Sequence, residues 1–205
     1  INGPLTGVNV PTGGRYMVVT KSPLNNMIAS SNSGGVWGAR LKYAGYDALI
    51  VEGKADKPVY ISIQDEKVEI LDADFLWGKE SLHVEEVLKE KYGKNASVLN
   101  IGPGGEKLAL MGCIMNEADR AAGRGGVGAV MGSKLLKAVV CSSTRTVVEP
   151  AHPEALRETV THSLKLIREN GVTGQGLPTY GTAVLVNIIN NLGSFPTKNW
   201  QEAEF

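Results

Sequence analysis

The chain has 205 residues, of which 21 are basic and 21 acidic, so its formal net charge is zero. Domains whose main partner is a nucleic acid usually carry a basic surplus, so this composition argues against that class. With 42% hydrophobic residues the chain can build a core, yet no apolar run reaches the roughly 20 residues of a membrane helix. No signal peptide stands at the start. We therefore expect a cytoplasmic protein that contacts neither nucleic acid nor membrane.

In chain order, glycine- and proline-rich loops alternate with short strands and helices, beginning with a loop over residues 1–14. Helices are expected at 36–43, with Ser33 near the start, and at 79–92 on the surface, ended by Gly93. Runs of apolar and β-branched residues predict strands at 16–20, 27–31, 47–52, 59–63, 68–71, 98–101, 107–115 and 135–141.

After residue 148 the sequence becomes helical in pattern. Four apolar residues fall at helical spacing: Leu156, Val160, Leu164 and Ile167. A loop is expected over 172–182, then a helix from Thr182 to Asn191 that is apolar on more than one face. We expect an α+β domain at 1–148 and the beginning of an α-helical domain at 149–205. Since little sequence remains to cover the last helix, we expect a fragment of a longer protein.

The stretch 116–134 combines glycines with two arginines, Arg120 and Arg124. Glycine lets backbone N–H groups approach a ligand closely, and successive N–H groups form concavities that hold anions. Guanidinium groups bind phosphate in a bidentate manner. The stretch therefore predicts a site for a phosphate-bearing ligand.

A similar arrangement occurs earlier in the chain. A Gly-Pro turn, a strand, a glycine-rich turn and another strand follow one another twice, and such internal repetition indicates a duplicated unit. The two Gly-Pro turns are Gly3-Pro4 and Gly102-Pro103, and the two glycine turns begin at Gly34 and Gly125. A duplication of this kind suggests a ligand with two similar halves.

Other motifs are weak. Gly123–Gly128 matches G-x-G-x-x-G, but no strand leads directly into it and no acidic residue stands at the end of the next strand, as a dinucleotide site requires. Cys113 and Cys141 form no metal motif and are expected to be inert, reduced thiols. No residue is predicted to be catalytic.

Several segments resemble the tungsten-containing aldehyde ferredoxin oxidoreductases over nearly the whole length of the chain. They are Gly3-Pro-Leu-Thr-Gly7, Pro11-Thr-Gly-Gly-Arg-Tyr16, Asn32-Ser-Gly-Gly35, Lys42-Tyr-Ala-Gly-Tyr-Asp47, the run from Arg120 to Lys134, and Gly176-Leu-Pro-Thr-Tyr-Gly181. In that family, two molybdopterins related by pseudo-twofold symmetry sit on a β-rich platform and hold one tungsten, and magnesium bridges their phosphates.

The resemblance implies roles for particular residues. Asn32 and the backbone carbonyl of Ala121 match magnesium-binding positions, and Arg15 matches an arginine between the pterin and a 4Fe–4S cluster. The remaining pterin-contacting positions are Gly34, Arg120, Ala122 and Gly123. These residue types suit magnesium and a pterin. Magnesium prefers oxygen donors together with phosphates, and the arginine guanidinium suits phosphate and the planar edge of a pterin.

The sequence departs from the family because the four cluster cysteines and the later glutamate and histidine for proton transfer are absent. The resemblance implies a platform for an enzyme that oxidises small aldehydes to carboxylates and reduces ferredoxin. This platform needs the remainder of the parent protein. The resemblance does not distinguish tungsten from molybdenum, does not identify the aldehyde and does not decide whether the protein is a homodimer. Two alternatives stay open: a nucleotide-dependent oxidoreductase using Gly123–Gly128, and a non-catalytic homologue of the platform.

Overall fold

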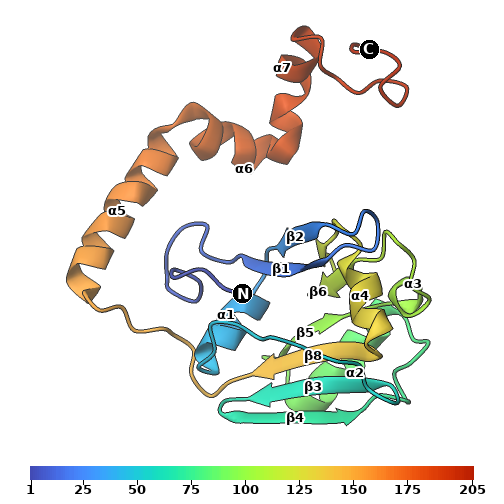
Figure 1. Cartoon of the computed structure of the whole chain (residues 1–205). Coiled ribbons are helices and arrows are strands. Elements are labelled where there is room, and N and C mark those ends of the chain that lie inside the picture. The colour runs from blue at the N-terminus through green and yellow to red at the C-terminus, as the bar shows by residue number, and fades with distance from the viewer. The chain divides into compact units, whose positions relative to one another are not determined.

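The framework of the computed structural model, which describes residues 1–205, is a six-stranded sheet with strand order β4-β3-β8-β5-β6-β7 (Figure 1). β3 and β8 are parallel, and all other neighbours are antiparallel. β8 is apolar apart from Lys137 and Ser142, since side chains on both of its faces are buried. The strands are β3 (Val59–Gln64), β4 (Lys67–Asp72), β5 (Ser97–Asn100), β6 (Ile114–Asn116), β7 (Arg120–Ala122) and β8 (Leu136–Ser142).

Two apolar clusters lie on opposite faces of this sheet. On one face, Val84 and Leu88, one helical turn apart, are fully buried, while the far side of their helix stays exposed. On the other face, Tyr16, Trp37 and Met131 bring a hairpin and two helices onto the sheet. The covering elements are α2 (Ser81–Tyr92) on the first face, and β1 (Tyr16–Lys21), β2 (Ile28–Ser33), α1 (Trp37–Tyr43) and α4 (Val127–Ser133) on the second.

The expected repetition is visible in the order of elements. The β1–β2 hairpin and the β6–β7 hairpin are each followed by a glycine turn and a seven-residue helix, α1 or α4. The turns contain Gly35 at φ 94° and Gly125 and Gly126 at φ 73° and 69°, conformations that favour glycine. The second Gly-Pro turn leads into the short helix α3 (Pro103–Glu106).

Three expectations about the first unit were wrong. Residues 47–52 form no strand because no neighbouring strand pairs with them, and Ile50 is 82% exposed. Residues 107–113 are turns, so the strand expected at 107–115 is reduced to β6; Leu108 has φ 59°. Ser33 does not cap α1, since it lies in β2 and the Glu117 carboxylate instead accepts a hydrogen bond from the Val36 amide at 2.8 Å.

A second unit, Pro150–Phe205, is separate from the first, Ile1–Glu149. Its long helix carries the expected apolar stripe, but none of its side chains is fully buried. The loop expected at 172–182 is helical, because the Asn170 side chain accepts hydrogen bonds from the Val172 and Thr173 amides. The elements are α5 (Pro153–Glu169), the π-helical turn η1 (Val172–Gly176), α6 (Leu177–Tyr180), the 3-10 turn η2 (Gly181–Leu185) and α7 (Val186–Asn191).

None of these helices combines the length and the apolar character that crossing a lipid bilayer requires.

Candidate functional site

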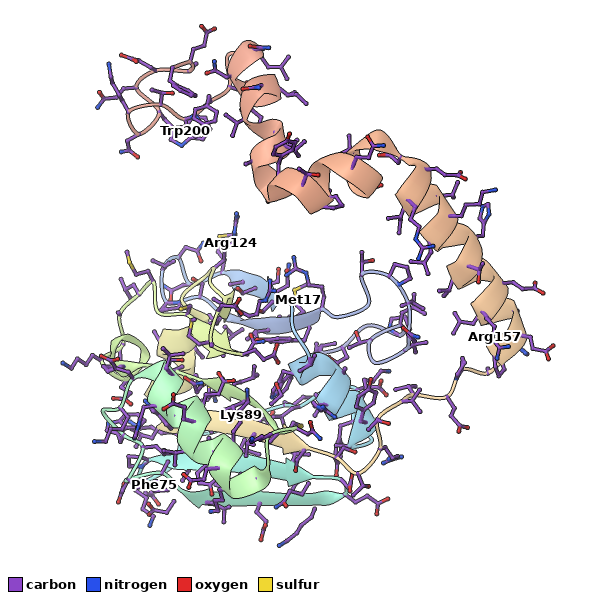
Figure 2. The ribbon with its side chains drawn as sticks, turned by 180° about the vertical axis from the view of Figure 1, so that it is seen from behind. Met17, Phe75, Lys89, Arg124, Arg157 and Trp200 are labelled. Carbon is purple, nitrogen blue, oxygen red and sulfur yellow. The ribbon has the colours of Figure 1, made fainter.

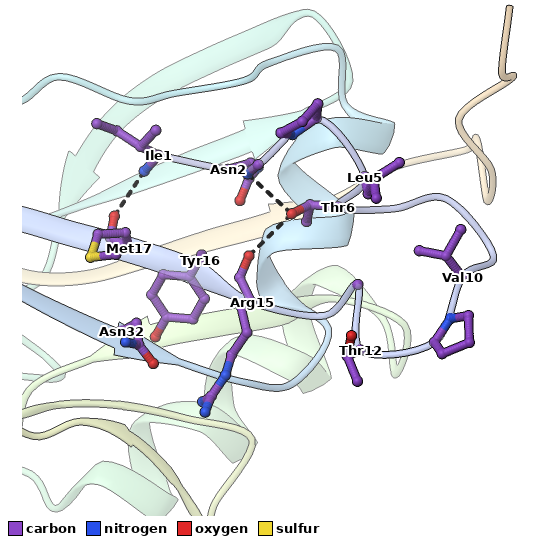
Figure 3. Close-up of a pocket in the computed structure, with 14 residues that line it drawn as sticks. Ile1, Asn2, Leu5, Thr6, Val10, Thr12, Arg15, Tyr16, Met17 and Asn32 are labelled. Carbon is purple, nitrogen blue, oxygen red and sulfur yellow. Dashed lines mark hydrogen bonds between the residues drawn. The ribbon is translucent and has the colours of Figure 1, made fainter. Parts of the chain in front are cut away.

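The β1–β2 hairpin brings together Arg15 and Asn32. Asn32 pairs with Met17 across the hairpin, and alternation along the strands places both side chains on its exposed face. Arg15 directly precedes β1, and its backbone oxygen accepts a hydrogen bond from the Thr6 hydroxyl at 3.1 Å. Arg15, Asn32 and the first loop line a cavity of about 690 Å³ (Figure 3). The first loop closes one side of this cavity. Two of the expected site residues, Arg15 and Asn32, therefore line the same cavity.

The second glycine turn lies against the same hairpin. The Arg124 amide donates a hydrogen bond to the Ser31 hydroxyl at 3.0 Å, and Gly125 packs close to Ala29. Figure 2 shows Arg124 and Met17 projecting from the same side of the first unit. The second glycine turn therefore lies against β2, and the first glycine turn follows the end of the same strand.

A buried asparagine at the end of β6 holds the first glycine turn and the β1–β2 hairpin. The Asn116 side-chain oxygen accepts hydrogen bonds from the Tyr16 hydroxyl at 2.8 Å and the Ser33 hydroxyl at 2.9 Å. Its amide nitrogen donates to the Gly34 carbonyl at 3.0 Å. Because Asn116 is fully buried, each of these polar groups depends on the others for its partner.

Between the Ser31–Arg124 contact and the Gly34–Asn116 contact lie Asn32 on one strand and β7 on the other. β2 and β7 are in contact. The structure therefore gathers the expected site residues in one region: Arg15, Asn32, Gly34, Arg120, Ala121, Ala122 and Gly123. Ala122 is the buried member of this set, and Ala121 and Gly123 are exposed.

Glu117, the residue after β6, is a second link to the first glycine turn. The sequence did not reveal this role of Glu117. One carboxylate oxygen accepts from the Val36 amide and the other from the Ser97 hydroxyl at 2.6 Å. A Cβ on Gly35 would overlap this carboxylate, so glycine is required there. Asn116 and Glu117 open the stretch that the sequence singled out, but a lone polar residue carries no local signal of partners 80 or more positions away.

The glycines of the two turns fall into two kinds. At Gly126 and Gly128 a Cβ would overlap the carbonyl oxygens of Leu110 and Cys113, so protein atoms fill the space beside them. At Gly123 a Cβ would meet nothing within 4 Å, and at Gly34 its nearest neighbour is the Arg15 guanidinium at 3.6 Å. Gly34 and Gly123 are thus open to a ligand, whereas most of the G-x-G-x-x-G match serves packing.

The donor types present fit a cation shared with a phosphate ligand. No group of three or more His, Cys, Asp or Glu side chains could hold a metal ion by itself. The amide oxygen of Asn32 and a backbone carbonyl at Ala121 are neutral oxygen donors, and magnesium commonly completes such a set with phosphate oxygens and water. Arg120 is exposed and reaches only the equally exposed Asp119, at 3.5 Å, so its charge is free for an anion.

The thiols of this chain do not fit an iron–sulfur cluster, which is held by four cysteines. Cys113 and Cys141 are both free, and Cys141 is fully buried in β8. Burial raises the pKa of the Cys141 thiol to about 12. This confirms the expectation of an inert thiol at Cys141, because the reactive thiolate is disfavoured.

The raised pKa of Cys141 predicts a pH dependence of stability. The unfolded thiol ionises near its ordinary pKa of 9.0 while the folded thiol stays protonated, so the folded state binds more protons and stability falls as pH rises. Above pH 9, the free energy of unfolding is expected to fall by up to about 1.4 kcal/mol more per pH unit than in Cys141→Ala. Urea unfolding of both proteins between pH 8 and 11 measures this; equal slopes would contradict it.

Two family models and several known proteins match this chain. The family model described as "Aldehyde ferredoxin oxidoreductase, N-terminal domain" matches residues 1–143, and that for domains 2 and 3 matches residues 158–205. The tungsten-containing aldehyde ferredoxin oxidoreductase of Pyrococcus horikoshii is 55% identical over 99% of this chain and 33% of the relative. That of Pyrococcus furiosus is 54% identical over 97% of this chain and 33% of the relative.

More distant relatives carry other names. The WOR-like subunit of an aliphatic sulfonate oxidoreductase of Pyrococcus furiosus is 36% identical over 98% of this chain and 34% of its own length. The solved complex BamBC of benzoyl coenzyme A reductase with 1,5-dienoyl-CoA matches with a TM-score of 0.75 and 39% identity, over 81% of this chain and 26% of the other. The chain spans about a third of the length of the curated relatives it matches.

Proposed function

Because the chain belongs to the aldehyde ferredoxin oxidoreductase family, we propose that it is the cofactor-binding part of an enzyme that oxidises aldehydes. The proposed reaction converts an aldehyde and water into a carboxylate, three protons and two electrons, with ferredoxin as the electron acceptor. The parent protein is proposed to act in the cytoplasm, with this chain supplying the platform for a tungsten or molybdenum bis-molybdopterin.

The observation that carries this proposal is the contact between the β1–β2 hairpin and β7 on one side of the first unit. Arg15, Asn32 and Gly34 lie in or beside the first hairpin, and residues 120–123 are β7 and the residue that follows it. Two related turns suit a cofactor with two related halves. When bound, the metallopterin supplies the redox chemistry, and the protein supplies binding, orientation and electrostatics.

Each residue in the proposed site has a binding task rather than a catalytic one. Arg15 is proposed to lie between the pterin and the 4Fe–4S cluster, and Arg120 to contact the pterin, since a guanidinium group suits phosphate and planar pterin edges. Asn32 and the carbonyl of Ala121 would hold magnesium between the phosphates, and the open faces of Gly34 and Gly123 allow close approach of the cofactor. The 4Fe–4S cluster and the proton-transferring groups belong to the rest of the parent protein, and a homodimer remains compatible with this arrangement.

The substrate is assigned from the relatives and not from the geometry of the platform. Relatives named for aldehyde, aliphatic sulfonate and benzoyl-CoA chemistry all share this part of the chain. The platform therefore accommodates different substrates, and we assign aldehyde from the relatives that are 52–55% identical. The nucleotide-dependent alternative is not favoured, since Gly126 and Gly128 are packed against protein backbone.

Elemental and pterin analysis of the purified full-length protein tests the proposal. We expect stoichiometric tungsten or molybdenum together with a pterin, and aldehyde-dependent reduction of ferredoxin. An enzyme that is active while free of both metal and pterin would refute the proposal. A protein that holds the cofactor but is inactive on aldehydes would refute only the substrate assignment.

In the full-length protein, Arg120→Ala is expected to lower cofactor retention about tenfold or more, since a charge-assisted hydrogen bond contributes roughly 1.5–3 kcal/mol. The free energy of unfolding should change by less than about 0.5 kcal/mol, because the side chain is exposed. Metal content after dialysis, measured by mass spectrometry, gives the readout.

Arg157→Ala, on the exposed surface of α5, is the matched control and should retain the cofactor. Equal retention in both variants would remove Arg120 from the site.

A further inference from the structure

The loop between β6 and β7 has a strained backbone. Asn116 pairs with Arg120 across this hairpin, so the loop consists of residues 117–119. Glu117 has φ 49° and Ala118 has φ 62°, a region that residues other than glycine rarely adopt because the side chain crowds the backbone. Two such residues in succession persist only where the surrounding structure holds them. The loop therefore needs contacts that keep it in this conformation.

A buried carboxylate on α2 supplies one of these contacts. The Ala118 amide donates a hydrogen bond to Glu85 Oε2 at 2.8 Å. Glu85 is only 5% exposed, and its other carboxylate oxygen forms an ion pair with Lys89, one helical turn further along α2 (Figure 2). The Ala118 amide is the one hydrogen-bond donor outside α2 that reaches the Glu85 carboxylate. The buried charge is therefore directed at the loop.

The loop is held a second time through its own side chain. Glu117 accepts hydrogen bonds from the Ser97 hydroxyl in β5 and from the Val36 amide at the start of α1. The Asp119 amide donates to the Glu117 carbonyl at 2.6 Å and closes the turn. Since α2 packs on the first face of the sheet and α1 on the second, the loop is tied to elements on both faces.

The strand that leaves this loop carries residues of the proposed cofactor site. β7 consists of only Arg120, Ala121 and Ala122, and it lies at the edge of the six-stranded sheet with β6 as its one neighbour there. A strand this short takes its position from the loop that leads into it. Magnesium requires near-ideal octahedral geometry, so a small shift of the Ala121 carbonyl would weaken its binding. The conformation of residues 117–119 thus matters to the site.

We propose that Glu85 is a positioning residue for the cofactor site. Its carboxylate fixes the Ala118 amide, keeps the loop in its left-handed conformation, and thereby places Arg120 and the Ala121 carbonyl. This inference rests on the proposed function, in which these two residues of β7 contact a pterin and a magnesium ion. Glu85 is buried and acts only through the loop, so its role is to orient the binding groups and not to take part in catalysis.

The strain at Ala118 distinguishes this role from a purely structural one. Glycine adopts left-handed conformations without steric cost, so the substitution Ala118→Gly should make the loop less dependent on Glu85. If Glu85 holds the strained loop, its loss should be largely compensated in the Ala118→Gly background. If Glu85 only stabilised α2, the effect of its loss would not depend on residue 118.

Cofactor retention by variants of the full-length protein tests the proposal, with tungsten or molybdenum content measured by mass spectrometry after dialysis. Glu85→Met keeps the length of the side chain but removes its strong acceptor. It should lower retention by about tenfold or more, as the loss of an outer partner of a metal site typically does. Glu85→Gln keeps an oxygen acceptor for the Ala118 amide and should stay within about twofold of the wild type. Adding Ala118→Gly to Glu85→Met should recover most of the loss.

Leu88→Ala is the matched structural control. Leu88 is fully buried on the same helix, so its truncation destabilises the packing of α2 without touching the loop. Thermal unfolding should show that Leu88→Ala is destabilised at least as much as Glu85→Met, while its cofactor retention should equal that of the wild type.

The outcomes separate this inference from the proposed function. Wild-type retention in Glu85→Met, an equal loss in Leu88→Ala, or no recovery on adding Ala118→Gly would overturn the positioning role and leave the cofactor assignment intact. A wild-type protein that holds neither metal nor pterin would overturn the proposed function and the role of Glu85 with it.

Discussion

Asn116→Ala is expected to lower the free energy of unfolding by about 3–5 kcal/mol, because it removes three hydrogen bonds and leaves their buried partners unsatisfied, each at a cost of roughly 1–3 kcal/mol. The three partners are the Tyr16 hydroxyl, the Ser33 hydroxyl and the Gly34 carbonyl. Equilibrium unfolding in urea measures the change, read from the midpoint at constant slope.

Asn95→Ala is the control for this variant, since Asn95 is exposed and makes no side-chain hydrogen bond. Its effect should stay within about 0.5 kcal/mol. If Asn116→Ala lowers the free energy of unfolding no more than this control does, the three hydrogen bonds of Asn116 do not stabilise the fold as its geometry indicates.

A double-mutant cycle with Tyr16→Phe measures how much the Tyr16–Asn116 hydrogen bond contributes to stability. Tyr16→Phe alone should cost about 1 kcal/mol. Because the two side chains are hydrogen-bonded, the cost in the Asn116→Ala background should be smaller, with a coupling energy of at least about 0.5 kcal/mol. Full additivity would show that the Tyr16–Asn116 bond contributes nothing to stability.

Much of the first unit could be predicted from the sequence because its elements are marked locally. The strands expected at 59–63 and 68–71 are confirmed as β3 and β4, and the helix expected at 79–92 is confirmed as α2, ended by Gly93 at φ 93°. Alternating apolar residues and a glycine at the helix end are signals within a few positions of each other. The family resemblance is likewise confirmed, because it rests on contiguous motifs.

Sequence patterns failed where the outcome depends on distant partners. An apolar run such as 47–52 indicates a segment suited to burial, but it does not show whether a neighbouring strand is present to pair with it. The run 107–113 is similar, since Leu110 and Met111 are exposed. Asn116 and Glu117 bond to groups 81 to 100 positions away, in β1, in β2 and at the start of α1, and no local pattern indicates such contacts. The roles of the seven expected site residues stay predictions until cofactor binding is measured.

A buried ion pair beneath the second Gly-Pro turn allows another large effect to be tested. The Lys137 side chain is fully buried in β8, and its ammonium donates to the carbonyls of Lys79 and Ile101 at 2.8 and 2.6 Å and to the Glu106 carboxylate. Burial lowers the pKa of Lys137, against the opposing effect of Glu106. The pair therefore ties β8 to α3, the helix that opens the second half of the platform.

Removing only one partner of this pair leaves the other charge buried. Lys137→Met is expected to lower the free energy of unfolding by about 3–5 kcal/mol, since a lone buried charge costs more than the pair contributes. Urea unfolding of Lys137→Met and of the double variant Lys137→Met/Glu106→Gln measures this. The double variant should recover part of the loss, because no uncompensated charge remains.

The exposed pair Lys57–Asp72 supplies the control, because Lys57→Met should cost no more than about 1 kcal/mol at the surface. If Lys137→Met were no more costly than Lys57→Met, the buried pair would not fix α3 to the sheet. If the double variant were as unstable as the single one, the loss would arise from the hydrogen bonds to Lys79 and Ile101 and not from the stranded Glu106 charge. Comparing these variants therefore separates the cost of a buried, unpaired Glu106 charge from the cost of losing the hydrogen bonds that Lys137 donates to the Lys79 and Ile101 carbonyls.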